Sequence, residues 1–212
     1  MNVDKASMLL YAVTDRAWLG GRALEEDVER AIQGGATFVQ IREKALSYDA
    51  FLAEAKKLKA VTDRYGIPFV INDDVEIALA VDADGVHVGQ SDMEAGDVRE
   101  KLGPEKIIGV SVRTVEQALL AQQRGADYLG VGAVFPTSTK PDAAEVSFDT
   151  LQAICEAVDI PVVAIGGIQQ ENVMELKGSG IDGVAVVSAI FAAEDIETAA
   201  RRLHSTMEEL IG

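Results

Sequence analysis

One short polar motif, Gln40-Ile41-Arg42-Glu43-Lys44, brings together residue types that could bind an anion. It follows a β-branched and aromatic run that predicts a strand, and the two-residue period of a strand points Gln40, Arg42 and Lys44 to the same side. An amide and two cations are costly to bury without a partner, and they suit a multiply charged ligand such as pyrophosphate. A solvated strand end with scattered charge is the competing interpretation.

Two carboxylates follow the next two expected strands. Asp73 comes after residues 68–71 and Asp92 after residues 85–88, so both can reach one point if the strands are neighbours. Paired carboxylates beside cations suggest Mg²⁺ bound to pyrophosphate, because magnesium uses one or two carboxylates together with substrate phosphates. Capping of a following helix is the alternative, and it competes more strongly for Asp74 than for Asp73.

Further polar or glycine residues follow the later expected strands. They are Ser111, Thr137, Ser138, Thr139, Lys140, Gly167 after Gly166, and Ser188 after Val187. Hydroxyls, a cation and glycines that allow close backbone approach suit one or more phosphates. Tight-turn chemistry and a solvated loop are the plainer interpretations. Because these polar residues all follow the ends of successive strands, we favour a functional site over these plainer interpretations.

The elements that must position these residues alternate along the chain. We expect strands at residues 9–13, 38–41, 68–71, 85–88, 107–110, 128–131, 162–165 and 183–187, and helices at 24–33, 48–65, 75–81, 96–102, 114–124, 148–158, 170–177 and 196–210. Eight such units predict a single (β/α)8 barrel (TIM barrel) spanning residues 1–212. A doubly wound open sheet competes, but the Gly-x-Gly-x-x-Gly typical after its first strand is absent.

Composition limits the partners and the chemistry. The net charge of −16 argues against nucleic acid and against an anionic membrane surface. No signal peptide or membrane-spanning run is evident, so we expect a cytoplasmic protein. The single cysteine, Cys155, lies in an apolar helical pattern and is expected to be a buried hydrophobe. His87 is expected to be a satisfied core residue, and His204 to lie on the surface.

Taken together, the motifs closely resemble thiamine phosphate synthase. The matching stretches are residues 11–15, 40–44, 71–74, 87–92, 109–111, 136–140, 166–168 and 187–190, which run from near the N-terminus to the last strand. The order of Gln-Ile-Arg-Glu-Lys before Pro-Thr-Ser-Thr-Lys is highly specific.

The resemblance implies a site for two substrates and one metal. By that analogy, hydroxymethylpyrimidine diphosphate would be held by Gln40, Ile41, Arg42, Glu43, Lys44, Asn72, Ser111 and Lys140. The thiazole phosphate would be held by Thr137, Ser138, Thr139, Gly167, Val187 and Ser188, and one Mg²⁺ by Asp73 and Asp92. Arg42, Lys44, Ser111 and Lys140 would be the catalytic residues, and a homodimer is expected.

The chemistry of such a reaction fits the residues. A pyrimidine with an amino group stabilises the charge on its methylene when pyrophosphate leaves, so the protein must neutralise the leaving group and exclude water rather than supply a nucleophile. A thiazole tautomerase on the same barrel and a non-catalytic binder of thiamine phosphate are the alternatives. Neither needs the full set of cations and carboxylates.

Overall fold

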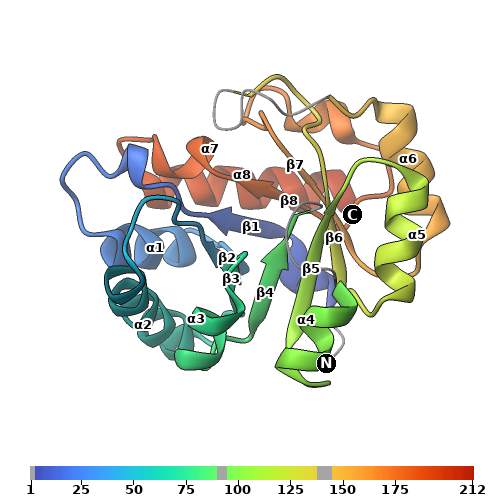
Figure 1. The fold of residues 1–212 in the computed structure, drawn as a ribbon. Coiled ribbons are helices and arrows are strands. Elements are labelled where there is room, and N and C mark those ends of the chain that lie inside the picture. The colour runs from blue at the N-terminus through green and yellow to red at the C-terminus, as the bar shows by residue number, and fades with distance from the viewer. Residues whose placement is uncertain (1–2, 90–94, 138–144) are drawn as a thin grey trace.

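The computed structural model describes residues 3–89, 95–137 and 145–212, and within them eight parallel strands close into one barrel (Figure 1). The strands are β1 Leu10–Val13, β2 Phe38–Ile41, β3 Phe69–Asn72, β4 Gly85–Val88, β5 Ile107–Val112, β6 Tyr128–Val131, β7 Val162–Ile165 and β8 Gly183–Val186. Each pairs with its sequence neighbours, and β1 pairs with β8 to complete the ring. The predicted (β/α)8 barrel is therefore confirmed, and the open sheet is excluded.

Helices surround the strands (Figure 1). They are α1 Leu24–Gln33, α2 Tyr48–Tyr65, α3 Val75–Ala80, α4 Ala95–Leu102, α5 Val115–Gln123, α6 Phe148–Ala157, α7 Ser188–Phe191 and α8 Ile196–Ile211, with 3-10 helices η1 Lys5–Met8, η2 Arg16–Trp18 and η3 Val173–Leu176. Among the described residues, no helix is long and apolar enough to span a membrane.

Two of the elements that follow β7 and β8 differ from the expectation. The helix predicted at residues 170–177 is only the short η3, because the Asn172 side chain accepts a hydrogen bond from the backbone N–H of Gln169 and so competes with helix formation. The unpredicted α7 has four residues, too few to show a helical period in the sequence.

Period-two alternation along the strands separates two cores. In β1, Leu10 and Ala12 belong to the layer between barrel and helices, whereas Tyr11 and Val13 belong to the barrel interior. Strands buried on both sides read as continuous apolar runs, which is why their sequences do not alternate in polarity. The alternation also decides which side chains after a strand end can face the barrel axis.

Side-chain caps fix where several helices begin. The residues that accept the capping hydrogen bonds are Ser47 for α2, Asp74 for α3, Thr114 for α5, Ser147 for α6 and Asp195 for α8. Each cap replaces a missing backbone partner in the first helical turn. The loops that join strands to helices are thereby held at both ends.

His204 is half-buried, which corrects the expectation that it lies on the surface. Its Nδ1 lies 2.7 Å from the carbonyl oxygen of Gly35, on the turn after α1. A Cβ at Gly35 would lie 2.9 Å from the His204 ring, so the glycine makes room for the imidazole. The contact belongs to the packing of α8 against α1.

We predict that Cys155 reacts very slowly with thiol reagents in the folded protein. It is partly buried against the core, and burial raises the pKa of its thiol to about 12. At pH 8 only about one thiol in 10⁴ is then ionised, and the thiolate is the reactive form. Labelling with iodoacetamide in native buffer and in denaturant measures this. Native labelling as fast as denatured labelling would contradict it.

Candidate active site

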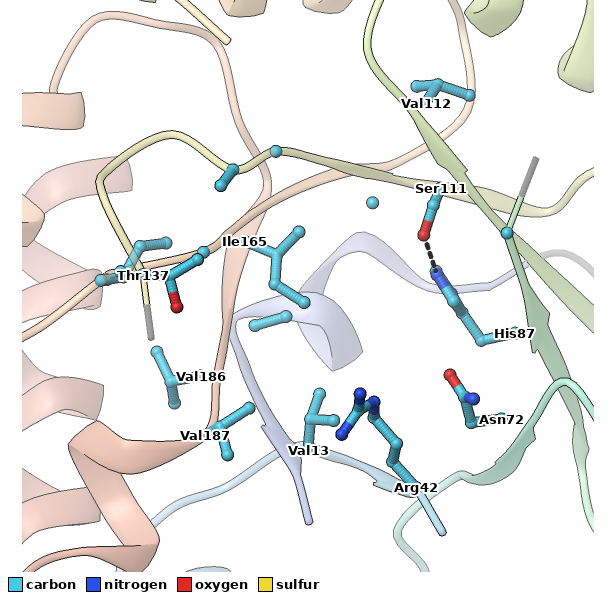
Figure 2. A pocket seen from close by; sticks show the side chains of 18 of the residues that line it. Val13, Arg42, Asn72, His87, Ser111, Val112, Thr137, Ile165, Val186 and Val187 are labelled. Carbon is cyan, nitrogen blue, oxygen red and sulfur yellow. Dashed lines mark hydrogen bonds between the residues drawn. The ribbon is translucent and has the colours of Figure 1, made fainter. Parts of the chain in front are cut away.

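A cavity of about 580 Å³ opens at the carboxyl ends of the strands, a size that suits a small-molecule ligand. Its lining includes nine residues singled out from the sequence: Arg42, Lys44, Asn72, Asp73, Ser111, Thr137, Gly167, Val187 and Ser188. Figure 2 shows Arg42, Asn72, His87 and Ser111 on one side of this space, with Thr137, Val186 and Val187 across from them. The expected gathering of polar groups at one end of the barrel is thus present.

Three members of the Gln-Ile-Arg-Glu-Lys motif do not line the cavity. The Ile41 side chain is fully buried in the layer between barrel and helices, so it faces away from the barrel axis. Glu43, two residues on, is bound by Arg16 outside the cavity. Gln40 lies deeper, inside the barrel, where its Nε2 donates to the hydroxyl of Tyr11 at 3.0 Å. The side chains of Ile41 and Glu43 thus lie outside the cavity lining, and the part expected of these two residues in binding the diphosphate stays a prediction.

Four predicted site residues lie outside the described part of the chain. They are Asp92, Ser138, Thr139 and Lys140. Ser138, Thr139 and Lys140 belong to the segment between β6 and α6, and both ends of that segment are hydrogen-bonded to the rest of the protein. Phe135 N–H donates to Gly166 O at 3.1 Å, and Val146 N–H donates to Ala133 O at 2.8 Å. The roles of these four residues stay predictions.

Two of the cations that line the pocket, Arg42 and Lys44, each have a carboxylate neighbour. Arg42 Nη1 lies 3.4 Å from Asp15 Oδ2, and Lys44 Nζ lies 2.8 Å from Asp73 Oδ2. Asn72 Nδ2 also donates to Asp73, at 2.6 Å. These two cations are therefore paired in the ligand-free protein, and an anionic ligand could take the place of the carboxylates.

Asp73, which lines the cavity, has an unusual backbone conformation. Its φ of 64° is in the left-handed region, which a non-glycine residue adopts at a cost and which clusters at functional sites. The neighbouring Asp74 takes the capping role instead, because its side chain accepts from Ile77 N–H at 2.9 Å. Within the described residues no cluster of three metal-ligating side chains occurs. The metal-binding role expected for Asp73 and Asp92 therefore stays a prediction.

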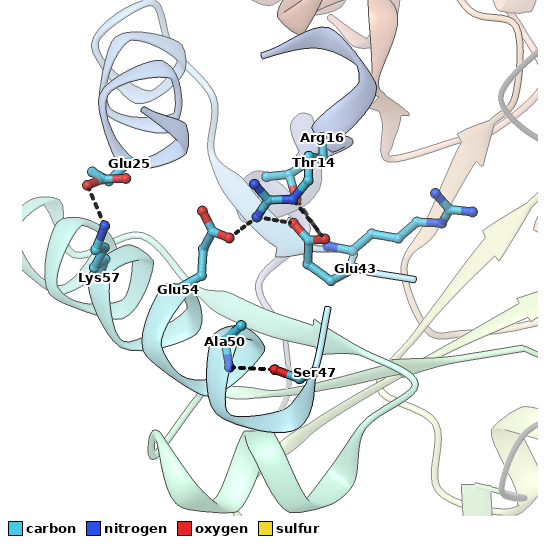
Figure 3. Close-up of polar contacts among 9 residues, drawn as sticks. Thr14, Arg16, Glu25, Glu43, Ser47, Ala50, Glu54 and Lys57 are labelled. Carbon is cyan, nitrogen blue, oxygen red and sulfur yellow. Dashed lines mark hydrogen bonds and ion pairs between the residues drawn. The ribbon is translucent and has the colours of Figure 1, made fainter. Parts of the chain in front are cut away.

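A cluster of charges ties the loop after β1 to the loop after β2 (Figure 3). Arg16 pairs with Glu43 at 3.1 Å and also with Glu54, and burial raises the pKa of the Glu43 carboxyl. The backbone N–H of Arg42 donates to Thr14 Oγ1 at 3.1 Å. The position of Arg42 thus depends on the β1 loop.

Sequence reasoning missed this role of the β1 loop. Thr14, Asp15 and Arg16 follow the first strand at the same end of the barrel as the other site residues, which is the signal that could have found them. It also missed Arg113 and Gln117, which line the cavity beyond β5.

The opposite wall is built from the loops after β7 and β8. Gly166 and Gly167 have φ angles of 100° and 68°, and a Cβ at Gly167 would lie 2.4 Å from the carbonyl oxygen of Pro136. Gln169 Nε2 donates to Ser188 Oγ at 2.9 Å, and Asn172 Nδ2 to Gly167 O at 3.0 Å. These contacts hold the glycine turn against the start of α7, a position where barrels often bind phosphate.

His87 is a satisfied interior residue, as expected. Its Nδ1 lies 2.9 Å from Tyr128 Oη and its Nε2 lies 2.8 Å from Ser111 Oγ. Burial lowers the pKa of the imidazole to about 4, so the ring is neutral at physiological pH. His87 therefore lines the pocket as a neutral side chain.

Comparisons with known proteins agree over nearly the whole chain. A family model described as thiamine monophosphate synthase matches residues 10–190. A thiamine-phosphate synthase from Clostridium tetani is 53% identical over 200 residues, covering 94% of this chain and 96% of the relative. One from Ruminiclostridium cellulolyticum is 54% identical over 200 residues, covering 94% and 95%. The solved thiamine phosphate pyrophosphorylase from Pyrococcus furiosus has a TM-score of 0.91 and 42% identity, covering 98% of this chain and 99% of that one.

We predict that Gly167→Ala destabilises the protein more than Gly178→Ala. Both glycines have positive φ, at 68° and 87°, so both variants pay the left-handed conformational penalty of about 1 kcal/mol. Only at Gly167 does the added Cβ meet neighbouring backbone, since nothing lies within 4 Å at Gly178. Denaturant unfolding measures the difference. Equal free energies of unfolding for the two variants would contradict the close approach to Pro136.

Proposed function

The chain belongs to the thiamine monophosphate synthase family, and on that premise we propose which residues of its pocket hold the two substrates and the metal of this transferase. The reaction joins hydroxymethylpyrimidine diphosphate to a thiazole phosphate and releases pyrophosphate. The observation that carries the assignment is the division of the cavity into a cationic wall after β2 and β3 and a glycine and hydroxyl wall after β7 and β8.

The diphosphate belongs at the cationic wall. Arg42 offers a planar fork of donors and Lys44 a point charge, and both line the cavity beside Asn72. Ser111 adds a hydroxyl from β5, and Lys140 would add a further cation from its loop. The side chain of Ile41 packs in the core between barrel and helices, and that of Glu43 forms an ion pair with Arg16; both help to hold Arg42 and Lys44 in position.

The pyrimidine ring belongs deeper, towards Gln40. This side chain is 3% exposed, and among the described residues no hydrogen-bond donor reaches its Oε1. A buried carbonyl oxygen without a donor is unfavourable in the ligand-free protein and would gain from the amino group of an aminopyrimidine. This supports the placement of Gln40 in the pyrimidine site although it does not line the open cavity.

The thiazole phosphate belongs at the opposite wall. Gly167, Val187 and Ser188 lie there with Thr137, and Ser138 and Thr139 would add hydroxyls from the same loop. Backbone N–H groups exposed by a glycine turn and a helix start bind phosphate without a cation. The thiazole nitrogen would then face the pyrimidine methylene from across the cavity.

Asp73 fits the magnesium expected for this reaction. Its carboxylate lies beside Lys44 and Asn72 at the diphosphate wall, and Asp92 would be the second carboxylate. When bound, Mg²⁺ neutralises charge on the diphosphate and on the leaving pyrophosphate. It would also balance Asp73, so that Lys44 could turn its charge to the substrate.

The residues themselves then act by binding and by electrostatics. The C–O bond to the diphosphate breaks, the leaving pyrophosphate takes the electron pair, and the thiazole nitrogen supplies the pair for the new C–N bond. Arg42, Lys44 and Ser111, which line the cavity, stabilise the negative charge as it develops. No protein nucleophile is required, which suits a site with a neutral His87 and a distant Cys155.

A homodimer, a cytoplasmic location and the absence of nucleic-acid partners remain part of the proposal and rest on the family resemblance and the net charge of −16. The tautomerase and the non-catalytic binder are disfavoured because curated relatives over 50% identical are named as the synthase.

A coupling assay tests the function directly. Purified protein is mixed with the pyrimidine diphosphate and the thiazole phosphate, with and without Mg²⁺, and thiamine phosphate and pyrophosphate are followed. We expect both products in equal amounts and only with the metal. Thiazole phosphate binding without any product would instead support the tautomerase.

We predict that Asp73→Asn raises the Mg²⁺ concentration needed for half-maximal activity by at least about tenfold, since a carboxylate is lost as a ligand. The matched control is the adjacent Asp74→Asn, because asparagine still caps α3 and the control leaves the metal requirement unchanged. Binding of Mn²⁺ followed by electron paramagnetic resonance gives a second readout without turnover. The same metal requirement in both variants would remove Asp73 from the metal site.

A further inference from the structure

Arg113 is a cation of the cavity wall that has no part in the proposed site so far. It follows β5 directly, lines the cavity and is exposed. Arg42 and Lys44 each pair with a carboxylate, whereas within the described part of the chain no carboxylate forms an ion pair with Arg113. Arg113 therefore offers a positive charge that a ligand does not have to take from a protein partner.

Side-chain alternation along β5 directs Arg113 towards the barrel axis. Val112 packs in the layer between barrel and helices, so Ser111 before it and Arg113 after it both point inward. Gly109 is on the same side, and a Cβ there would lie 2.5 Å from His87 Nδ1. Exposure rises from the buried Gly109 through the half-buried Ser111 to Arg113, so Arg113 stands at the mouth of the cavity.

The backbone of Arg113 is fixed by the first turn of α5. Its N–H donates to Gln117 Oε1 at 2.8 Å, and Gln117 N–H donates to the capping hydroxyl of Thr114 at 3.2 Å. The guanidinium is therefore carried by a fixed backbone position. Only the torsions of the side chain have to be ordered when a ligand binds, which limits the entropic cost.

The position of Arg113 matches the outer end of the pyrimidine diphosphate. In the proposed site the ring lies towards the buried Gln40, so the diphosphate extends from there to the mouth of the cavity. Ser111 lies on the same side of the cavity as Arg42 (Figure 2). Arg113 comes two residues after Ser111, a rise of about 6.6 Å along a strand. The terminal phosphate carries the larger share of the negative charge, and a guanidinium offers it two parallel donors.

We propose that Arg113 binds the terminal phosphate of the pyrimidine diphosphate and so selects a diphosphate over a monophosphate. The inference rests on the proposed function for the identity of the substrate. The terminal phosphate stays part of the pyrophosphate when the C–O bond breaks, so Arg113 contacts the product as well. Thiazole phosphate lies across the cavity in the proposed site, and its affinity does not depend on Arg113.

Calorimetric titrations with Mg²⁺ present compare the wild-type protein with Arg113→Met. We expect pyrimidine diphosphate and inorganic pyrophosphate to bind about tenfold more weakly to the variant, since a charge-assisted contact is lost, and pyrimidine monophosphate to weaken by less than about twofold. Arg113→Lys keeps the charge but not the fork of donors, and it should lose about threefold for the diphosphate. Equal losses for monophosphate and diphosphate, or no loss for either, overturn the proposal.

Arg202→Met is the matched control. Arg202 lies on α8, is exposed and does not line the cavity, and its loss changes the net charge by the same unit. The control should bind every ligand as tightly as the wild-type protein does. If it lost as much diphosphate affinity as Arg113→Met, the effect would come from the overall charge, and the proposed contact would be wrong.

Steady-state kinetics gives a second readout and keeps the possible failures distinct. In Arg113→Met the KM for pyrimidine diphosphate should rise about tenfold and the KM for thiazole phosphate by less than about twofold. A rise in the KM for thiazole phosphate alone would place Arg113 at the other substrate and overturn the inference. The titrations need no turnover, so absence of the coupling reaction refutes the proposed function, whereas unchanged diphosphate affinity in an active Arg113→Met enzyme refutes only the role of Arg113.

Discussion

Polar side chains inside the barrel must pair with one another, and the rest of the site depends on this constraint. The interior has a low effective dielectric, so an unpaired amide, hydroxyl or imidazole there costs more than a hydrogen bond gains. Tyr11, Tyr128 and His87 meet this requirement in one connected chain, which also sets the floor of the pocket. The strands end above these residues, and side chains that point to the barrel axis from the strand ends, such as that of Arg42, reach the cavity.

The protein as a whole is strongly negative, yet its pocket presents cationic side chains. A chain with a net charge of −16 binds anionic substrates only if the attraction is local. Screening makes that feasible, since charges more than about 8 Å apart across solvent interact weakly at physiological salt. In the ligand-free pocket Arg42 and Lys44 are each balanced by a carboxylate, Asp15 and Asp73. In the proposed site, substrate binding would therefore exchange the partners of these cations rather than neutralise bare charges.

Repeating local patterns made the barrel and much of the pocket predictable. Strand period, helix stops and the position of polar residues at strand ends need only neighbouring residues. Ile41 and Glu43 point to the other side of the strand from Arg42, because side chains alternate along a strand. Assigning the whole motif to the site by family resemblance overlooks this alternation. Contacts such as Tyr11 with Tyr128, 117 residues apart, could not be inferred, because side-chain pairing across the barrel depends on register and on missing side chains such as that of Gly109.

The polarity of the pocket explains how a transferase can work here without an acid or a base. Arg42 and Lys44 can only donate hydrogen bonds. A leaving pyrophosphate gains negative charge as its bond breaks, so donors fixed in advance stabilise it more in the transition state than in the bound substrate. A charged His87 would add attraction, but burial inside the barrel lowers the pKa of the imidazole to about 4. The neutral ring is therefore the form that the barrel interior favours, and the attraction must come from cations at the strand ends.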